Sequence, residues 1–359
     1  MAKNHIVMYT VSMHRGGAER VMSILANSFA EIGYDVTLVT DIPVKNDGKN
    51  YSLLEDIKCV SIESPYKNFF KKNLYRIKRL RRIVKNEKAD VILSFLGKQN
   101  YRMLISTFGL KCRKCVSVRN DPRREYGDGR LKKWLANRLF SLADICVFQT
   151  REAKMFFNRS IQKKSIVIPN PVDEKFFNTE RAKKPKNIAT VGRLEPQKNH
   201  KLLIDAFAMI EDKIGKDKLL IYGAGSLEVP LRNYVRSMGM CNRIVFMGEV
   251  NNIEKELAKA KLFVLSSDYE GMPNSLMEAM VVGVPCVSTD CPCGGPRDLL
   301  GRHSSMLVKC GDVRGLANAM YESILKSYEN RIIDMKKYSR KTVFEMWEAI
   351  LLKDKGGGR

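Results

Sequence analysis

The sequence has no apolar run of about 18 residues, the length at which a helix can span a bilayer. Its first apolar stretch, residues 5–9, is too short for a secretory signal peptide and predicts a β-strand instead. We therefore expect a cytoplasmic protein without a transmembrane helix.

Disulfide and metal-binding patterns are missing too. The nine cysteines are an odd number without framework spacing, which favours a reducing compartment. Cys112 and Cys115 form a single C-x-x-C motif, and Cys291 and Cys293 flank one proline, so we interpret both pairs as free thiols. The sequence contains no Asp-x-Asp motif, the common carboxylate pair for a divalent metal. We expect neither a metal nor a cofactor.

Positive charge is abundant, and most of the excess lies in the first half. Residues 1–172 contain 33 Lys or Arg and 15 Asp or Glu, a balance of +18, whereas residues 173–359 contain 30 and 24, a balance of +6. In residues 67–88, Leu74, Ile77, Leu80 and Val84 fall on one helical face among ten basic residues. This pattern predicts a surface helix with its apolar stripe in the core and a basic face outside. Such a face attracts nucleic acid, anionic lipid or phosphorylated substrates.

Strands and helices alternate in both halves, with a turn cluster at residues 169–171 between them. Apolar runs of strand length lie at 5–10, 34–40, 89–95, 115–118 and 145–149, and again at 188–191, 218–222, 244–247, 262–266 and 285–288. The expected fold class is α/β, with two Rossmann-like domains, 1–172 and 173–335, facing a central cleft. A helix over 336–359 should pack back toward the first domain and end in a disordered tip.

A polar loop after the strand 188–191 offers two cations. Arg193 supplies a forked donor and Lys198 a compact ammonium group to phosphate oxygens. Groups of this kind stabilise a leaving diphosphate as its negative charge develops. The alternative is an ordinary solvated loop.

A second segment, residues 270–278, follows the strand 262–266. Gly271 lets the backbone approach a ligand closely, and the next amides lie at a helix start, where the dipole favours anions. Glu270 could accept sugar hydroxyl protons, and Glu278 those of a ribose. Alternatively, Ser275 and Glu278 form a capping box, which the spacing alone favours and which would make Glu278 structural.

Together these segments resemble glycosyltransferase family 4 of the GT-B fold. The shared features are Gly16-Gly17-Ala18-Glu19-Arg20, Gly192-Arg193-Leu194 with Lys198, the two glutamates at 270 and 278, and Gly294-Gly295-Pro296. Their order and spacing match from residue 5 to about 350. The resemblance implies a retaining hexosyltransferase for capsule, exopolysaccharide or lipopolysaccharide synthesis, and the missing Asp-x-Asp motif favours one that needs no metal.

The resemblance also implies residue roles. Arg193 and Lys198 would hold the diphosphate, and Glu278 the ribose. Glu270 would bind the donor sugar and act with the two cations as the catalytic set. Backbone contacts would come from Gly16, Gly17, Gly192, Val250, Gly271, Met272, Pro273, Asn274 and Ser275. Because no dedicated nucleophile is evident, a phosphate oxygen of the leaving group would take the acceptor proton in a front-face attack.

One position departs from the family pattern. Many relatives carry a first-domain histidine that contacts the donor sugar, but here the strand 115–118 leads into Arg119-Asn120-Asp121-Pro122. A subset of capsule and exopolysaccharide transferases has a similar stretch, so Arg119 or Asn120 is a candidate for this role. His14 is the other candidate, and its alternative is a solvated loop histidine.

The implied partners are a nucleotide sugar, with a UDP-hexose favoured by family analogy, a lipid-linked saccharide and an anionic membrane surface. We expect peripheral, mainly electrostatic association with the inner face of the cell membrane. Two other classes stay open. A GT-B epimerase would bind the donor without an acceptor. A nucleic-acid-binding protein is suggested only by the net charge of +24, and no zinc knuckle, helix-turn-helix or aromatic-rich basic strand supports it.

Overall fold

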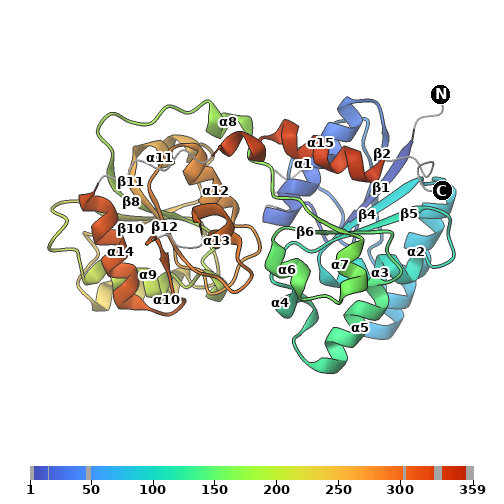
Figure 1. Ribbon diagram of the computed structural model, residues 1–359, viewed down its shortest axis with the longest axis horizontal. Coiled ribbons are helices and arrows are strands. Elements are labelled where there is room, and N and C mark those ends of the chain that lie inside the picture. The colour runs from blue at the N-terminus through green and yellow to red at the C-terminus, as the bar shows by residue number, and fades with distance from the viewer. Residues whose placement is uncertain (1–3, 15, 46–49, 302–304, 327–333, 353–359) are drawn as a thin grey trace. The chain divides into compact units, whose positions relative to one another are not determined.

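The computed structural model describes residues 4–14, 16–45, 50–301, 305–326 and 334–352, which form two compact α/β units (Figure 1). The first unit combines the residues up to Pro171 with those from Arg340 onward, and the second is Val172–Ser339. The tip at 356–359, expected to be disordered, lies outside the described residues. No helix in the described ranges has the length and hydropathy of a membrane span.

A seven-stranded parallel sheet in the order β3-β2-β1-β4-β5-β6-β7 forms the centre of the first unit. Its strands are β1 (His5–Thr10), β2 (Asp35–Thr40), β3 (Lys58–Ser61), β4 (Val91–Phe95), β5 (Arg113–Ser117), β6 (Ile145–Phe148) and β7 (Ser165–Val167). Its helices are α1 (Gly17–Glu31), α2 (Phe69–Asn86), α3 (Gly97–Ser106), α4 (Pro122–Tyr126), α5 (Arg130–Phe140), α6 (Arg151–Met155), α7 (Arg159–Lys163) and α15 (Arg340–Leu351). The central strands are buried because helices cover the sheet, which is why they read as apolar runs.

The basic helix α2 differs in one respect from its expected packing. Leu74, assigned to the buried face, is 53% exposed, whereas Arg76 is buried. The reason is Asp41, which directly follows β2 and accepts hydrogen bonds from Arg76 at 3.0 Å and Arg102 at 2.8 Å. The Tyr9 hydroxyl also donates to Asp41, at 2.7 Å. Because a buried carboxylate requires such partners, Arg76 is buried on the same face of α2 as Leu80 and Val84 of the apolar stripe.

The helix α15 belongs to the core of the first unit and lies beside α1 (Figure 1). Val343, Trp347 and Leu351 are buried in the same apolar cluster as the central strands. The ring centroid of Trp347 lies 5.9 Å from that of Phe95 in β4. Residues 340–351 therefore complete a core that begins at β1.

A six-stranded parallel sheet in the order β10-β9-β8-β11-β12-β13 forms the centre of the second unit. Its strands are β8 (Lys186–Val191), β9 (Leu219–Tyr222), β10 (Ile244–Gly248), β11 (Ala260–Leu265), β12 (Cys286–Thr289) and β13 (Leu307–Val308). Its helices are α8 (Glu174–Phe177), α9 (His200–Ala208), α10 (Glu228–Ser237), α11 (Ile253–Lys259), α12 (Asn274–Val281), α13 (Gly295–Leu300) and α14 (Val313–Leu325), with short 3₁₀ turns at η1 (Pro196–Lys198) and η2 (Met335–Tyr338). This strand order is that of a doubly wound Rossmann fold.

Each sheet has one point where the strand order reverses. The chain builds outward from β8 through β9 to β10, and then returns to β11 on the other side of β8. The first unit does the same between β1 and β4. In open parallel sheets, ligands bind outside the carboxyl ends of the strands at such a point. The loops after β8 and β11, and those after β1 and β4, are therefore the places to look for a site.

Candidate active site

The loops after β8 and β11 are fastened to each other. The amide of Asp268 donates to the carbonyl of Gln197 at 2.9 Å, and the Ser266 hydroxyl donates to the carbonyl of Lys198 at 2.9 Å. Asn199 adds a side-chain bond to the Asp268 carboxylate at 2.8 Å. These bonds hold two segments about 70 residues apart in the sequence as one rigid surface.

Lys198 and Glu270 form an ion pair within this surface. The Lys198 ammonium lies 2.5 Å from Oε1 of Glu270, a carboxylate whose residue is only 7% exposed. Ser267 donates to the same oxygen at 2.8 Å, and Gln197 to the other at 3.3 Å. The sequence predicted both charged residues, but not their pairing or the two polar residues that orient Glu270. The available signal for them was only that Gln197 and Ser267 lie on the polar loops after two buried strands.

His200, at the start of α9, is not a second cation beside Lys198. Burial, with a smaller contribution from Lys198, lowers the pKa of His200 to about 4. The imidazole is therefore neutral at physiological pH, and Lys198 remains the cation beside Glu270.

Arg193 is exposed on the loop after β8. Two glycines that follow β9 pack closely against the backbone of this loop. A Cβ atom on Gly223 would lie 2.1 Å from the carbonyl oxygen of Gly192, and one on Gly225 would lie 2.5 Å from that of Leu194. These two glycines let the turn after β9 press against the Arg193 loop. Their role is thus close packing behind the site.

The segment after Glu270 is held from the other side by α13. A Cβ atom on Gly295 would lie only 1.8 Å from the carbonyl oxygen of Gly271, so only glycine fits there. The Gly-Gly-Pro motif therefore brings α13 into direct contact with the Glu270 loop. Met272 is buried beside this contact.

The capping-box interpretation of Glu278 is wrong. Helix α12 begins at Asn274, its N-cap is Pro273, and no side chain caps it. Ser275 is already the second helical residue, so Glu278 lies past the first turn rather than at the capping position. Glu278 is 5% exposed. Pro273 has no N–H group, so the expected amide donor at this position is also wrong, and the first backbone amides of the helix are those of Asn274 and Ser275.

The remaining predicted residue of the second unit, Val250, follows β10. It is half-buried against the apolar cluster that contains Leu276 and Met277 of α12. Its neighbour Gly248 accepts a hydrogen bond from the amide of Gly223 at 2.8 Å. The loop after β10 thus joins the same edge of the sheet as the loops after β8 and β11.

In the first unit, three predicted residues lie on the loop after β1. Gly16 is the N-cap of α1, Gly17 is its first residue, and no side chain caps this helix. A helix start of this kind leaves backbone N–H groups for an anion. His14 is exposed and forms an isolated backbone bridge with Asn50.

Arg119 and Asn120 lie at the carboxyl end of β5. Arg119 is buried, its guanidinium stacks 4.6 Å from the centroid of Phe95, and it donates to Asn170. Burial lowers the pKa of Arg119 to about 9 and raises that of the adjacent Glu125 to about 7. Asn120 is partly exposed and accepts from the amide of Asp121 at 2.8 Å. Glu125 gave no signal in the sequence.

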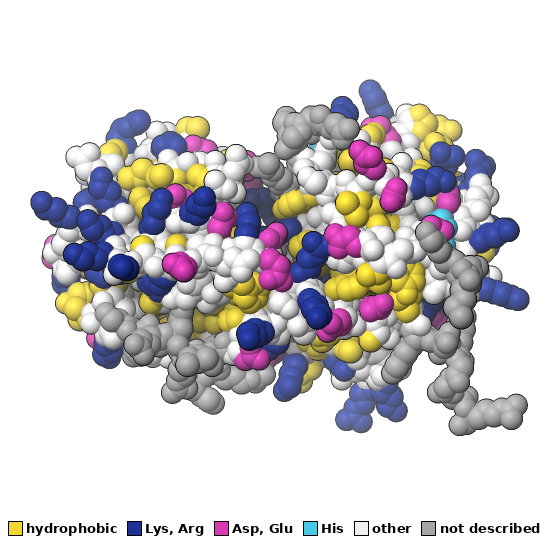
Figure 2. All heavy atoms as spheres, turned by 90° about the horizontal axis from the view of Figure 1, so that it is seen from above, with side chains coloured by type: hydrophobic (Ala, Val, Ile, Leu, Met, Phe, Trp, Pro, Cys, Tyr) yellow, Lys and Arg dark blue, Asp and Glu magenta, His cyan; other side chains and the backbone are white. Residues whose placement is uncertain are grey.

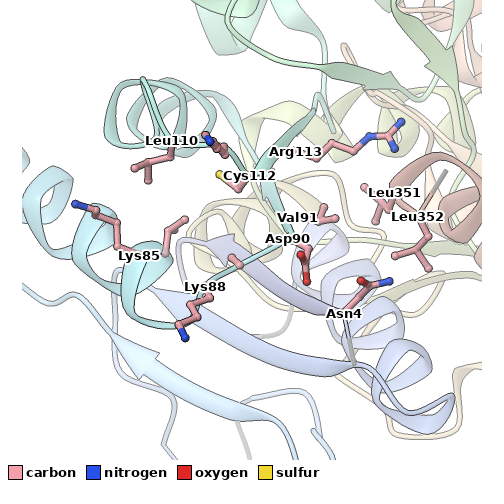
Figure 3. Close-up of a pocket in the computed structure, with 13 residues that line it drawn as sticks. Asn4, Lys85, Lys88, Asp90, Val91, Leu110, Cys112, Arg113, Leu351 and Leu352 are labelled. Atoms are coloured by element: carbon pink, nitrogen blue, oxygen red, sulfur yellow. The ribbon is translucent and has the colours of Figure 1, made fainter. Parts of the chain in front are cut away.

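A pocket of about 560 Å³ lies at the opposite edge of the first sheet (Figure 3). Asn4 precedes β1, Asp90 precedes β4, and Arg113 begins β5, so the pocket faces the amino ends of the strands. Figure 3 shows Lys85 and Lys88 around it. Because the pocket lies at the amino ends of the strands, it is separate from the loops at their carboxyl ends, which carry the predicted site residues.

The fold defines the structural class: it is the GT-B fold, as in solved structures that match nearly the whole chain. A crystal structure of HepE from Anabaena in complex with UDP and glucose superposes with a TM-score of 0.80. The match covers 97% of this chain and 99% of that one, at 16% identity, and supports the fold alone.

Two family models identify the chain further. Residues 15–176 match the model described as Glycosyltransferase Family 4, and residues 171–342 match the model for Glycosyl transferases group 1. Together the two models match residues 15–342, so the chain belongs to the glycosyltransferases that they describe.

Curated relatives agree. A Campylobacter jejuni enzyme named N-acetylgalactosamine-N,N'-diacetylbacillosaminyl-diphospho-undecaprenol 4-alpha-N-acetylgalactosaminyltransferase is 28% identical over 92% of this chain and 94% of its own length. An uncharacterized glycosyltransferase of Methanocaldococcus jannaschii is 29% identical over 64% of this chain and 62%, less than two thirds, of its own length.

Proposed function

We propose that this glycosyltransferase moves a hexose from a UDP-linked donor to a lipid-linked saccharide, with retention of configuration, in capsule, exopolysaccharide or lipopolysaccharide synthesis. The observation that carries the proposal is the Lys198–Glu270 pair on two fastened loops at the switch point. A cation and a carboxylate there suit the diphosphate and the hydroxyls of one donor. The name of the Campylobacter jejuni relative, with its diphospho-undecaprenol acceptor, supports the lipid-linked acceptor.

The proposed mechanism uses the site as an electrostatic clamp. Arg193 and Lys198 stabilise the charge that develops on the leaving diphosphate. Glu270, oriented by Ser267 and Gln197, binds the hydroxyls of the donor sugar. The acceptor hydroxyl attacks on the face from which the diphosphate departs, and its proton passes to a phosphate oxygen. The new glycosidic bond then has the configuration of the broken one.

Metal independence is part of this proposal. Among the residues that the structure describes, no group of three or more His, Cys, Asp or Glu is placed to hold a metal ion. We expect transfer to retain most of its rate in EDTA, because side-chain cations take the part that a metal plays elsewhere. A strict requirement for added magnesium in a steady-state assay would contradict this expectation.

To test the function, each of a set of UDP- and GDP-sugars is incubated with the protein, with and without a saccharide linked to a lipid diphosphate, and sugar transfer is measured. The expected result is transfer from a UDP-hexose only when the lipid-linked acceptor is present. A sugar interconverted without acceptor would instead indicate an epimerase. A rise in melting temperature identifies the nucleotide that binds, since a ligand at 100 times its Kd adds about 2.7 kcal/mol to the free energy of unfolding.

We further propose that the first unit binds an anionic membrane surface. We expected the basic residues of 67–88, Arg76 and Arg81 among them, to face the membrane. Arg76 does not, because it is buried and pairs with Asp41, and Arg81 donates to the carbonyl oxygens of Ser106 and Phe108. Lys71, Lys78 and Arg82 are exposed on one stripe of α2. Figure 2 shows Lys and Arg side chains spread over the visible face among acidic and hydrophobic ones, so charge alone does not mark the surface.

Exposed apolar side chains accompany this basic stripe. They lie on or beside the adjacent helices α2, α3 and α5 and are Phe69, Phe70, Leu74, Ile105, Phe108, Leu131, Trp134 and Leu135. Their exposed fractions, up to 79% for Phe70, are those of side chains with room to enter a lipid interface. The attraction therefore has an apolar part beyond the electrostatic one expected from the sequence.

The K71E/K78E/R82E triple variant should lower binding to anionic vesicles at least tenfold, since each lost cation removes about 1 kcal/mol of attraction. Sedimentation with vesicles measures this. The control is the same charge change on the second unit, at Lys213, Lys216 and Arg236, which should have little effect. A wild-type protein that binds neutral vesicles as tightly as anionic ones would contradict the basic stripe as an anchor.

A further inference from the structure

Two thiols lie side by side next to the Glu270 loop. Cys291 comes two residues after Thr289 of β12, and Cys310 comes two residues after Val308 of β13. Thr289 and Val308 are paired in the parallel register, so the two cysteines leave neighbouring strands at the same level. Parallel strands are about 4.8 Å apart, within the Cα separation of about 4.4–6.8 Å that a disulfide requires.

Both sulfur atoms contact one oxygen. The Cys291 thiol donates to the carbonyl oxygen of Ser267 at 3.3 Å, and the Cys310 thiol lies 3.7 Å from the same oxygen. The Cys291 thiol is also hydrogen-bonded to the Cys310 sulfur. Both cysteines are free thiols in the structure. The two sulfur atoms therefore meet at the same carbonyl oxygen, within reach of each other.

The two thiols differ in reactivity. Cys310 is partly exposed, and the hydrogen bond from Cys291 lowers its pKa. Cys291 is fully buried, and its role as donor, together with burial, raises its pKa. Because the thiolate is the nucleophile, Cys310 attacks first and Cys291 follows as the resolving thiol.

The pair touches the proposed site through Ser267. The hydroxyl of Ser267 donates to Oε1 of Glu270 at 2.8 Å, and its carbonyl oxygen accepts from Cys291. Cys310 also lies 3.6 Å from the carbonyl oxygen of Asp268. A change at the two sulfur atoms therefore reaches the Glu270 loop directly, through Ser267 and Asp268.

We propose that Cys291 and Cys310 form a reversible disulfide that lowers activity by displacing the Glu270 loop. Its co-reactant is a low-molecular-weight disulfide. The Cys310 thiolate attacks one sulfur of this disulfide, which releases a thiolate and leaves a mixed disulfide on Cys310. The Cys291 thiol then attacks the Cys310 sulfur, and its proton passes to the second departing thiolate. Two protein thiols become one disulfide, and one external disulfide becomes two thiols.

The effect on activity rests on the proposed function, whereas formation of the bond does not. Oxidation removes the thiol hydrogen atoms that bind the carbonyl oxygens of Ser267 and Asp268 and draws β12 and β13 together. Because the loop loses these hydrogen bonds and shifts, turnover should fall about fivefold to tenfold. Reduction should restore the rate, because the thiols and their hydrogen bonds return.

The experiment treats the full chain with oxidised glutathione, maps cross-linked peptides by mass spectrometry and measures donor turnover before and after reduction. The expected result is a peptide pair joined through Cys291 and Cys310 that disappears on reduction, together with the fall in turnover. Cys310→Ser, whose hydroxyl keeps a donor to the same oxygens, should be active and insensitive to glutathione. Cys293→Ser, which removes a buried cysteine of the same loop, should stay sensitive.

Two outcomes would overturn the proposal. One is the absence of the linked peptides from the oxidised wild-type chain, a readout that needs neither a variant nor an active enzyme. The other is a linked chain with unchanged turnover. If the linked peptides form but no donor is turned over even when the chain is reduced, the proposed function fails while the disulfide site stands.

Discussion

Replacing Lys198 with alanine is expected to lower turnover about 100- to 1,000-fold, the usual cost of losing one donor that stabilises developing charge. The ammonium group lies 2.5 Å from Glu270 on a loop that the neighbouring segment holds rigid. Its loss removes the proposed diphosphate contact and one of the three side-chain partners of the Glu270 carboxylate. Steady-state kinetics with saturating donor measure the effect, and Arg193→Ala should behave in the same direction.

The matched control for Lys198→Ala is Lys201→Ala. Lys201 lies on the first turn of α9 and pairs with Asp205, so its removal changes charge nearby but leaves the loop intact. Melting temperatures separate lost catalysis from unfolding, because Glu270 keeps its hydrogen bonds from Ser267 and Gln197. Full turnover in Lys198→Ala would show that Lys198 does not stabilise the leaving diphosphate.

Replacing Glu278 with glutamine is expected to weaken nucleotide binding about 10- to 100-fold, since hydrogen bonds to a charged group contribute about 1.5–3 kcal/mol. The substitution keeps the shape of the side chain and removes the charge that would accept two ribose hydroxyls. Because Glu278 lies beyond the first turn of α12, no cap is lost. Titration calorimetry with UDP measures the affinity, and the melting temperature of the free protein should change little.

The control for Glu278→Gln is the same substitution at Glu211. Glu211 pairs with Arg243, which also binds the carbonyl oxygens of Gly215 and Asp217 before β9, at the amino edge of the same sheet. This variant should bind UDP like the wild type. If Glu278→Gln lowers the melting temperature by many degrees and leaves affinity unchanged, Glu278 is a structural residue after all.

The sequence predicted the inner strands of both sheets and the edge strand β10, but it missed the other three edge strands, β3, β7 and β13. β1 was predicted with the bounds that it has, because a strand buried on both faces reads as a continuous apolar run. β3 and β7 are the two edge strands of the first sheet, and β13 is one of the two edge strands of the second. They are short, and β3 begins with exposed Lys58 and Cys59, so they carry no such run.

The site was predicted in its residue types but not in its contacts. Lys198 and Glu270 follow strands that are neighbours in the sheet but not in the sequence, so only the strand order brings them together. The burial of Arg76 was missed for the same reason, since its partner Asp41 follows a different strand. The capping box failed because a spacing of three residues also occurs inside a helix, and only the observed start at Asn274 decides between the two.

The position of α15 has a consequence for synthesis on the ribosome. Residues of the first unit emerge first, but Trp347 and Val343, which fill the space beside Phe95 and the central strands, emerge after all of Val172–Ser339. Until then, the nascent first unit exposes an apolar groove that chaperones or proteases can recognise. The second unit, whose residues are contiguous, can fold before the first is complete.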